Sequence, residues 1–182
     1  MIKANDRYNF HRHFPKPSAG RGKEYPILLE RVPNDHYSLL DFGCGKGGTI
    51  EYVKLNLPKV YVAGYDPFVA EYNRSEHLDR LWDYTFSGDT LEHIEEEHIP
   101  HVLETLNTIT RNSSIHVIDL DPADKTFPDG RNAHLALLSP EVWLDHFERA
   151  GLMVKDYRVE TWNTSRHLTL EAYATGTYDT DG

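Results

Sequence analysis

A glycine-rich stretch in the first third of the chain constrains the fold more than any other feature. The run Asp41-Phe42-Gly43-Cys44-Gly45-Lys46-Gly47-Gly48 lies between residues 37–42, which read as a buried strand, and residues 49–56, which read as a helix. Glycines let the backbone approach a ligand closely, and the start of a helix offers unpaired N–H groups. The sequence therefore predicts a strand–loop–helix unit with a ligand site where the strand ends.

The rest of the chain alternates predicted strands with predicted helices. One helix over residues 95–111 places five apolar side chains on one face: Ile99, Val102, Leu103, Leu106 and Ile109. Another, over residues 139–150, begins at Ser139-Pro140 and ends before Gly151, residue types that suit the two helix ends. The predicted strands cover residues 37–42, 60–65, 81–87, 114–120, 152–159 and 167–174.

This order of elements predicts an α/β fold with a mostly parallel, helix-covered sheet. Residues 160–166 leave no room for a helix between the last two strands. We therefore expect those two strands to be antiparallel neighbours.

Two acids beyond the glycines narrow the choice of ligand. Gly43, Gly45 and Gly48 satisfy Gly-x-Gly-x-x-Gly, which by itself suggests a dinucleotide. Asp66 ends the next strand and can accept both hydroxyls of a ribose, which suits a nicotinamide enzyme or another nucleotide ligand equally. Asp41, two residues before the first glycine, can meet an amino or cationic group.

These motifs resemble those of the class I (Rossmann-like) S-adenosylmethionine-dependent methyltransferases. Asp41, Gly43, Gly45 and Gly47 match the acid-x-Gly-x-Gly-x-Gly loop of that family, and Asp66 matches its ribose acid. Asp89-Thr90-Leu91-Glu92-His93 is similar to the Asp-Val-Leu-Glu-His motif of one branch, here in a small single-domain form. The resemblance runs from about Tyr37 to Ala174.

The resemblance implies a Rossmann-like sheet with an antiparallel last strand. It also implies S-adenosylmethionine as cofactor and S-adenosylhomocysteine as product. The cofactor-binding residues that it implies are Asp41, Gly43, Cys44, Gly45, Gly47, Asp66, Pro67, Phe68, Asp89, Thr90 and Leu91.

The sequence departs from the family between Asp66 and the Asp89 motif. Members usually have a further helix, a strand and an adenine-binding acid there, whereas only residues 67–81 are available here. We expect one outer strand to be shortened or missing. Pro67 and Phe68 would then hold adenine by apolar packing, although Phe68 could equally be an ordinary loop residue.

The long polar loop after residues 114–120 is the expected place for the methyl acceptor, because ligands lie at the carboxyl ends of parallel strands. Asp129, Arg131 and Asn132 are predicted to bind the acceptor. Many relatives have a histidine in this position facing the acceptor. His134 is therefore the first candidate for a catalytic base and His93 the second. Each histidine could instead brace a loop, and Arg131 could simply pair with Asp129.

Two other interpretations of the residues are less favoured. Asp119, Asp121 and Asp124 lie close together and could bind a divalent ion, but aspartates are common at strand ends and turns, and no metal site is predicted. A nicotinamide enzyme generally needs a second region for its substrate, which this chain does not offer.

The length and charge of the chain limit the classes of function that fit it. The chain has 182 residues and no internal repeat, which predicts a single domain over residues 25–182. Residues 1–24 form a basic arm with a charge of +4 before an acidic remainder, and the net charge of −10 disfavours nucleic acid as a partner. A single cysteine and the absence of any long apolar run predict a cytoplasmic protein without a membrane segment.

The function expected from the sequence is transfer of a methyl group to an oxygen or nitrogen of a small polar metabolite, such as a sugar, nucleotide or acid. The alternative is a regulatory protein that binds the cofactor without transferring a methyl group. Whether two copies pair as a homodimer is left open.

Overall fold

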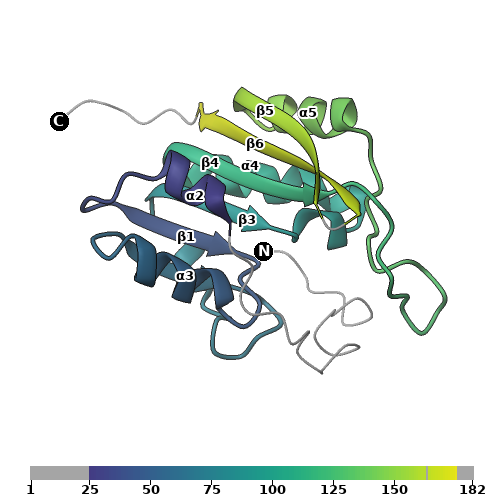
Figure 1. The fold of residues 1–182 in the computed structure, drawn as a ribbon, viewed down its shortest axis with the longest axis horizontal. Helices are drawn as coiled ribbons and strands as arrows, with labels where there is room; N and C mark the ends of the chain where they lie inside the picture. The colour runs from purple at the N-terminus through teal and green to yellow at the C-terminus, as the bar shows by residue number, and fades with distance from the viewer. Residues whose placement is uncertain (1–24, 163, 176–182) are drawn as a thin grey trace.

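The structure is a computed structural model that describes residues 25–162 and 164–175 (Figure 1). The predicted basic arm, residues 1–24, lies outside the described residues. The strands are β1 (Ser38–Phe42), β2 (Tyr61–Tyr65), β3 (Trp82–Gly88), β4 (Thr110–Asp119), β5 (Leu152–Trp162) and β6 (Ser165–Ala174). The α-helices are α2 (Pro26–Arg31), α3 (Gly48–Asn56), α4 (Ile99–Ile109) and α5 (Pro140–Arg149). Short 3-10 turns are η2 (Ser75–Leu78), η3 (Leu91–His93) and η4 (Glu96–His98).

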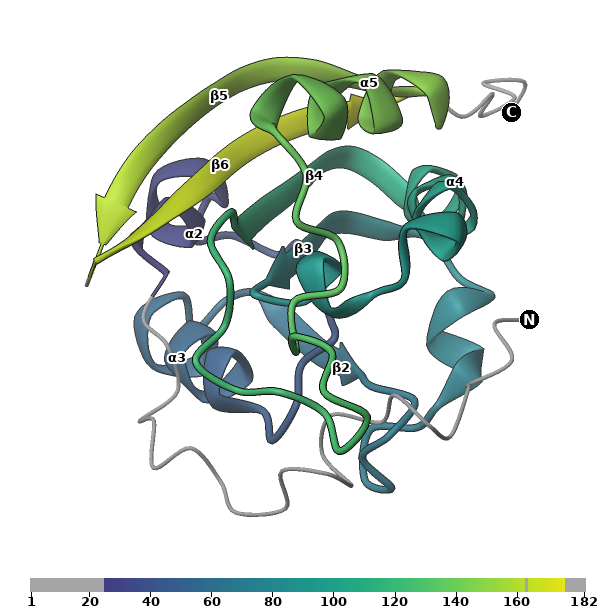
Figure 2. The ribbon, with the colours of Figure 1, turned by 90° about the vertical axis from the view of Figure 1, so that its right-hand side faces the viewer.

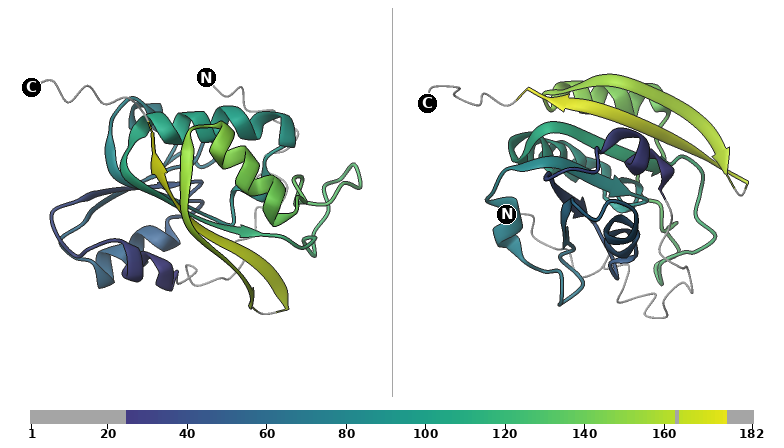
Figure 3. Two further views of the ribbon diagram at one scale, coloured as in Figure 1. Left: turned by 90° about the horizontal axis from the view of Figure 1, so that it is seen from above. Right: turned by 60° about the vertical axis from the view of Figure 1, so that its left-hand side comes forward.

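All six strands belong to one sheet in the order β2-β1-β3-β4-β6-β5. The pairs β1–β2, β1–β3 and β3–β4 are parallel, whereas β6 runs antiparallel to both β4 and β5. The predicted mostly parallel sheet with an antiparallel last strand is confirmed. The β5–β6 hairpin extends past its neighbours at its turn end (Figure 3).

Helices cover both faces of the sheet, so the chain has two apolar cores (Figure 2). On one face α4 and α5 bury Leu103, Trp143 and Phe147 against the sheet. On the other face α2 and α3 bury Leu28 and Val53. The five apolar positions predicted to share one face of α4 are all buried, as their spacing requires.

Among the described residues no strand lies beyond β2, in agreement with the expectation that one outer strand is shortened or missing. Beyond β2, the edge strand, residues 66–81 hold only the turn η2. This segment folds over Trp82 instead: the indole Nε1 donates to the carbonyl oxygen of His77 at 2.8 Å, and the two rings meet edge to face at 5.5 Å. A fully buried tryptophan thus receives the cover that a helix and strand would otherwise supply.

The helix predicted over residues 95–111 ends earlier, and β4 begins at Thr110 rather than at residue 114. The buried Thr110 hydroxyl donates to the carbonyl oxygen of Leu106 at 2.6 Å and bonds to Thr85 of β3 at 2.7 Å. The long-range bond to Thr85 favours an extended conformation at a position where the local sequence gives no stop signal. Gly151 has a φ of +79°, as expected of a residue that ends a helix.

The parallel strands end at one side of the molecule. The glycine loop after β1, the segment after β2, η3 after β3 and the long loop after β4 all lie there (Figure 1). The fold therefore gathers the predicted site residues from four separate parts of the chain at one sheet edge.

Candidate cofactor and acceptor site

Three glycines between β1 and α3 adopt left-handed backbone angles that other residues rarely adopt. Their φ values are +76° at Gly43, +52° at Gly45 and +81° at Gly47. There is also no room for a side chain: a Cβ on Gly43 would lie 2.1 Å from the Thr90 side chain, and one on Gly47 would lie 2.2 Å from the Tyr72 hydroxyl. This loop, called the cradle below, is therefore a stretch of backbone on which other groups can pack closely.

Asp66 joins this cradle to the segment after β2. Its Oδ2 accepts a hydrogen bond from the Gly45 N–H at 3.0 Å, and its Oδ1 accepts one from the Phe68 N–H at 2.9 Å. The carboxylate thus lies beside the glycine loop, where sequence reasoning expected the ribose acid. Pro67 and Phe68 follow it and are half-buried.

Asp41 lies beneath the same loop and is almost completely buried, with 2% of its surface exposed. Its Oδ2 atom has no hydrogen-bond partner among the residues that the structure describes. Burial and the nearby charge of Asp66 raise the pKa of Asp41 to about 8, against the effect of a hydrogen bond with Thr49. Such a carboxyl group is costly to bury unless a donor or a cation meets it.

The end of β3 closes the cradle on its other side. The Thr90 hydroxyl lies 3.3 Å from the carbonyl oxygen of Gly43 and 3.1 Å from that of Gly88, so it ties β3 to the glycine loop. Asp89 has a φ of +47° and accepts a hydrogen bond from the Tyr25 hydroxyl at 3.2 Å. His167 of β6 approaches the other oxygen of Asp89 at 3.9 Å.

Two predicted cofactor residues lie in the cores instead of lining the cradle with their side chains. Leu91 is fully buried in the core beneath α4. The Cys44 thiol packs in the core beneath α3, and burial raises the pKa of that thiol, so it stays protonated. Their backbones remain at the site edge, but their side chains serve the fold.

The loop after β4 is held by its own polar side chains. Asn132 accepts from the backbone N–H groups of Ala123 and His134 and donates to the carbonyl oxygen of Ala123. Arg131 lies 3.1 Å from both Asp129 and Glu95. Arg131 therefore does pair with Asp129, the alternative that the sequence left open, and it also links this loop to the start of the α4 segment.

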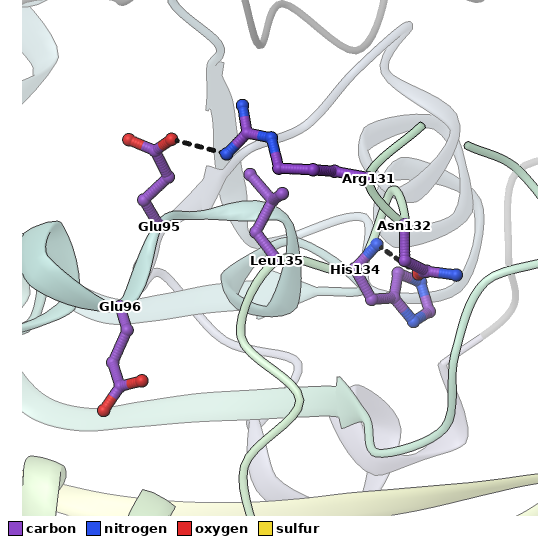
Figure 4. Close-up of a pocket in the computed structure, with 6 residues that line it drawn as sticks. All are labelled: Glu95, Glu96, Arg131, Asn132, His134 and Leu135. Carbon is purple, nitrogen blue, oxygen red and sulfur yellow. Dashed lines mark hydrogen bonds and ion pairs between the residues drawn. The ribbon is translucent and has the colours of Figure 1, made fainter. Parts of the chain in front are cut away.

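A cavity of about 300 Å³ lies where this loop meets that segment (Figure 4). Its lining residues are Glu95, Glu96, Arg131, Asn132, His134 and Leu135. The lining is mostly charged or polar, which suits a small polar molecule rather than an apolar one.

The two histidines proposed as alternative bases prove to be neighbours. The rings of His93 and His134 meet edge to face with centroids 4.8 Å apart. The backbone joins their segments, because the carbonyl oxygen of Glu92 accepts from Leu135 N at 2.7 Å and from Ala136 N at 3.0 Å. The sequence separation of residues 93 and 134 does not predict this contact, because the contact depends on the path of the intervening loop.

Two of the three aspartates considered as a metal site have partners within the protein. Asp121 accepts two bonds from the Arg166 guanidinium, at 2.7 and 3.0 Å, and these hydrogen bonds lower the pKa of its carboxyl group. Asp119 accepts from the Asp121 N–H at 3.0 Å. Together they shape the turn after β4.

Sequence reasoning missed Tyr25, Tyr72 and the carboxylate of Glu92 as parts of this region. Tyr25 precedes α2 and reaches Asp89 across 64 positions of the chain. Tyr72 covers Gly47. Of these three residues, only Glu92 could have been identified from the sequence, because it belongs to the Asp89–His93 motif.

Comparisons with known proteins bear on the fold. No protein-family model matches the chain, and no curated protein matches it. Among solved structures, magnesium protoporphyrin IX methyltransferase from Synechocystis, with bound S-adenosylmethionine, is 14% identical with a TM-score of 0.59, covering 82% of this chain and 76% of that one. The 1,6-didemethyltoxoflavin-N1-methyltransferase from Burkholderia thailandensis, with bound S-adenosylhomocysteine, is 15% identical with a TM-score of 0.59, covering 82% and 76%.

A candidate O-methyltransferase from Nostoc punctiforme is 14% identical with a TM-score of 0.58, covering 81% of this chain and 53% of that one. The chain thus spans about half the length of that protein. These likenesses establish the fold, which is that of the class I, Rossmann-like S-adenosylmethionine-dependent methyltransferases.

Proposed function

We propose that this protein is an S-adenosylmethionine-dependent methyltransferase that acts on an oxygen or nitrogen of a small polar metabolite. The observation that carries the proposal is the Asp41 carboxyl group. It is buried beneath a glycine cradle with one oxygen lacking a partner among the described residues. A cationic ligand with an amino group would pair with that oxygen. Asp66, the candidate ribose acid, lies beside the same glycine loop.

The residues present fit this cofactor. Asp41 would meet the positive charge of the amino acid part, and the Asp66 carboxylate would accept the ribose hydroxyls. Pro67 and Phe68 would pack on adenine, while Asp89 and Thr90 would line the opposite side, where Thr90 bonds to Gly43. When bound, the cofactor supplies an electrophilic methyl group, and the protein's task is to align a nucleophile with it.

The acceptor end is proposed to be the cavity beside η3 and the loop after β4. A volume of about 300 Å³ suits a small metabolite. Arg131 would bind an anionic or hydroxyl-rich part of the acceptor, with Asp129 and Asn132 holding the loop around it. The His93–His134 pair, treated as one unit, would promote loss of the acceptor's proton.

Transfer of label tests this function. The full chain is incubated with methyl-labelled S-adenosylmethionine and a fractionated pool of small metabolites, and products are separated by chromatography and mass. We expect label in at least one small polar compound, with formation of S-adenosylhomocysteine. A protein that binds the cofactor tightly but labels nothing from several such pools would instead be a non-catalytic binding protein.

A further inference from the structure

Three side chains that can bind metal converge beside the acceptor cavity. Glu92, His93 and His134 each offer one ligand atom, and these three atoms lie within 4.8 Å of one another. Glu92 has no exposed surface and His134 is 8% exposed, while His93 is half-buried. His134 also lines the cavity (Figure 4).

Hydrogen bonds orient both imidazoles so that Nε2 is the nitrogen that can bind a metal ion. The Nδ1 atom of His93 lies 2.8 Å from the carbonyl oxygen of Ala133, and the Nδ1 atom of His134 lies 2.5 Å from that of Asp121. A carbonyl oxygen can only accept, so each Nδ1 carries a proton, and in the neutral ring the lone pair is then on Nε2. Metal-ligating histidines almost always donate their other ring N–H in this way.

The frame around the three side chains is rigid. The Glu92 carbonyl oxygen accepts two backbone bonds from the residues after His134, and Asn132 accepts from the His134 N–H at 2.8 Å. The Glu92 Oε1 atom accepts from the Asp119 N–H at 3.3 Å. Ligands held by such second bonds need little reorganisation to bind an ion.

We propose that Glu92, His93 and His134 form a binding site for one divalent transition-metal ion, with the remaining coordination positions open toward the cavity. Around an ion with ligands at 2.0–2.2 Å, ligand atoms lie about 3.4 Å apart. Side-chain rotations that move the ligand atoms by little more than about 1 Å therefore bring the three atoms to that spacing.

The donor set selects the class of metal. Two imidazole nitrogens and one carboxylate oxygen suit zinc, iron, cobalt or manganese better than magnesium or calcium, which prefer all-oxygen sites. Three protein ligands with open positions are typical of sites that bind a water or a substrate. A second group, Glu95, Glu97 and His98, is more exposed than the first, and its histidine provides the internal control.

The role of the ion, unlike its binding, rests on the proposed function. An ion here would bind the acceptor's oxygen and lower the pKa of its hydroxyl, so that the proton leaves to water. The histidines would then act as ligands in place of accepting the proton themselves. This departs from the sequence analysis, which predicted no metal site.

The test is titration of the metal-stripped full chain with Co²⁺, without cofactor, followed by visible absorption and calorimetry. We expect one Co²⁺ per chain, displaced by Zn²⁺ and not by equimolar Mg²⁺. His134→Ala and His93→Gln should each weaken binding at least about tenfold. The control His98→Ala should bind as the parent does. Thermal melts establish that each variant is folded.

Three outcomes would overturn the proposal. These are no binding by the parent at 100 µM Co²⁺ or Zn²⁺, loss of binding in His98→Ala, or undiminished binding in both folded variants. Where His134→Ala fails to fold, His93→Gln decides. The role of the ion in methyl transfer is tested separately by label transfer with and without a chelator. Equal transfer in both samples would show that the ion has no such role. Absence of transfer in both defeats the proposed function but leaves the metal site standing.

Discussion

Two carboxylates at the glycine loop, Asp41 and Asp66, lie in different electrostatic environments. Asp66 accepts two backbone N–H bonds, which compensate a buried negative charge. Asp41 has one oxygen without a partner among the described residues, and burial with the nearby Asp66 raises its pKa to about 8. At neutral pH Asp41 is therefore mostly protonated until a cation arrives.

Cofactor binding should consequently release a proton from Asp41. A bound cation lowers the pKa of Asp41, so near pH 7 the complex holds fewer protons than the protein alone. Affinity should rise as the pH increases toward about 8 and then level off, because above that pH Asp41 is already ionised. Calorimetry at pH 7 in two buffers of different ionisation enthalpy measures the released proton. Asp41→Asn should abolish this proton release. Equal proton release by the variant would contradict the assignment of Asp41 as its source.

Alanine substitutions at Gly43 and Gly130 distinguish the cost of backbone strain from the cost of a steric clash. Both have positive φ, +76° and +88°, but only at Gly43 would a Cβ meet other atoms, those of Thr90. Gly130→Ala should cost about 1–2 kcal/mol, the usual penalty of a left-handed alanine. Gly43→Ala should cost more and abolish cofactor binding. Urea unfolding and cofactor titration on both variants check this. Equal costs would mean that Thr90 moves aside freely.

Arg131 provides a test of the acceptor cavity. Arg131→Ala should raise the acceptor's KM several-fold with little change in kcat, because a residue that binds the acceptor remotely from the reacting atom contributes ground-state binding. Steady-state kinetics with the acceptor identified by labelling measures this. Arg149→Ala, which breaks an exposed pair with Asp145 on α5, is the matched control. An unchanged KM would leave Arg131 as a brace between Asp129 and Glu95.

At the scale of elements, a directed chain of hydrogen bonds joins β3 to β4 inside the sheet. Thr110 donates to a carbonyl oxygen of α4, so it must accept from Thr85, and Thr85 in turn must accept from Ser114. Ser114 therefore accepts from Nε2 of His116 at 2.6 Å, and Nδ1 of His116 accepts from Ser87 at 2.7 Å. The imidazole is held neutral in one tautomer.

This arrangement makes stability depend on pH. Burial lowers the pKa of His116 to about 3 from its ordinary value of 6.5, so below that ordinary value the unfolded chain binds more protons than the folded one. The contribution of His116 to the free energy of unfolding should fall by up to about 1.4 kcal/mol per pH unit as the pH drops below about 6.5.

Asp41, whose pKa is raised, has the opposite effect over the same range, so the parent and a His116→Asn variant must be compared. Urea unfolding at pH 7.5, 6 and 5 should show the difference in stability between the two shrinking toward low pH. A constant difference would mean that His116 titrates normally.

The sequence predicts elements well where the signal is local. The period of α4, the glycines after β1 and the short 67–81 segment each anticipate what the structure contains, including the missing outer strand. The start of β4 at Thr110 could not be predicted, because it depends on a bond to Thr85 of the neighbouring strand β3.

The same distinction applies to the site. Asp41, Asp66 and Asp89 gather because parallel strands end at one edge, which the element order alone implies. The contact of His93 with His134, and that of Tyr25 with Asp89, depend on loop paths that no local pattern encodes.

At the scale of the whole molecule, the sheet separates structural from functional parts. Two cores occupy its faces, while the candidate site occupies the carboxyl edge of β1, β2, β3 and β4 (Figure 2). Within the described residues, no helix has the length and apolar character to cross a membrane. The candidate site thus combines loop residues with a few side chains, such as Asp41 and Leu91, that are buried in the body of the fold.

Calorimetric titration of the full chain with S-adenosylmethionine and S-adenosylhomocysteine tests the central claim most directly. We expect one site per chain in the micromolar range. Asp66→Ala and Asp66→Asn should each bind at least about tenfold more weakly, since a ribose loses a charged acceptor. Asp79→Ala, an exposed acid of the same segment, should bind as the parent does. Absence of binding by the parent, or equal binding by the Asp66 variants, would contradict the account.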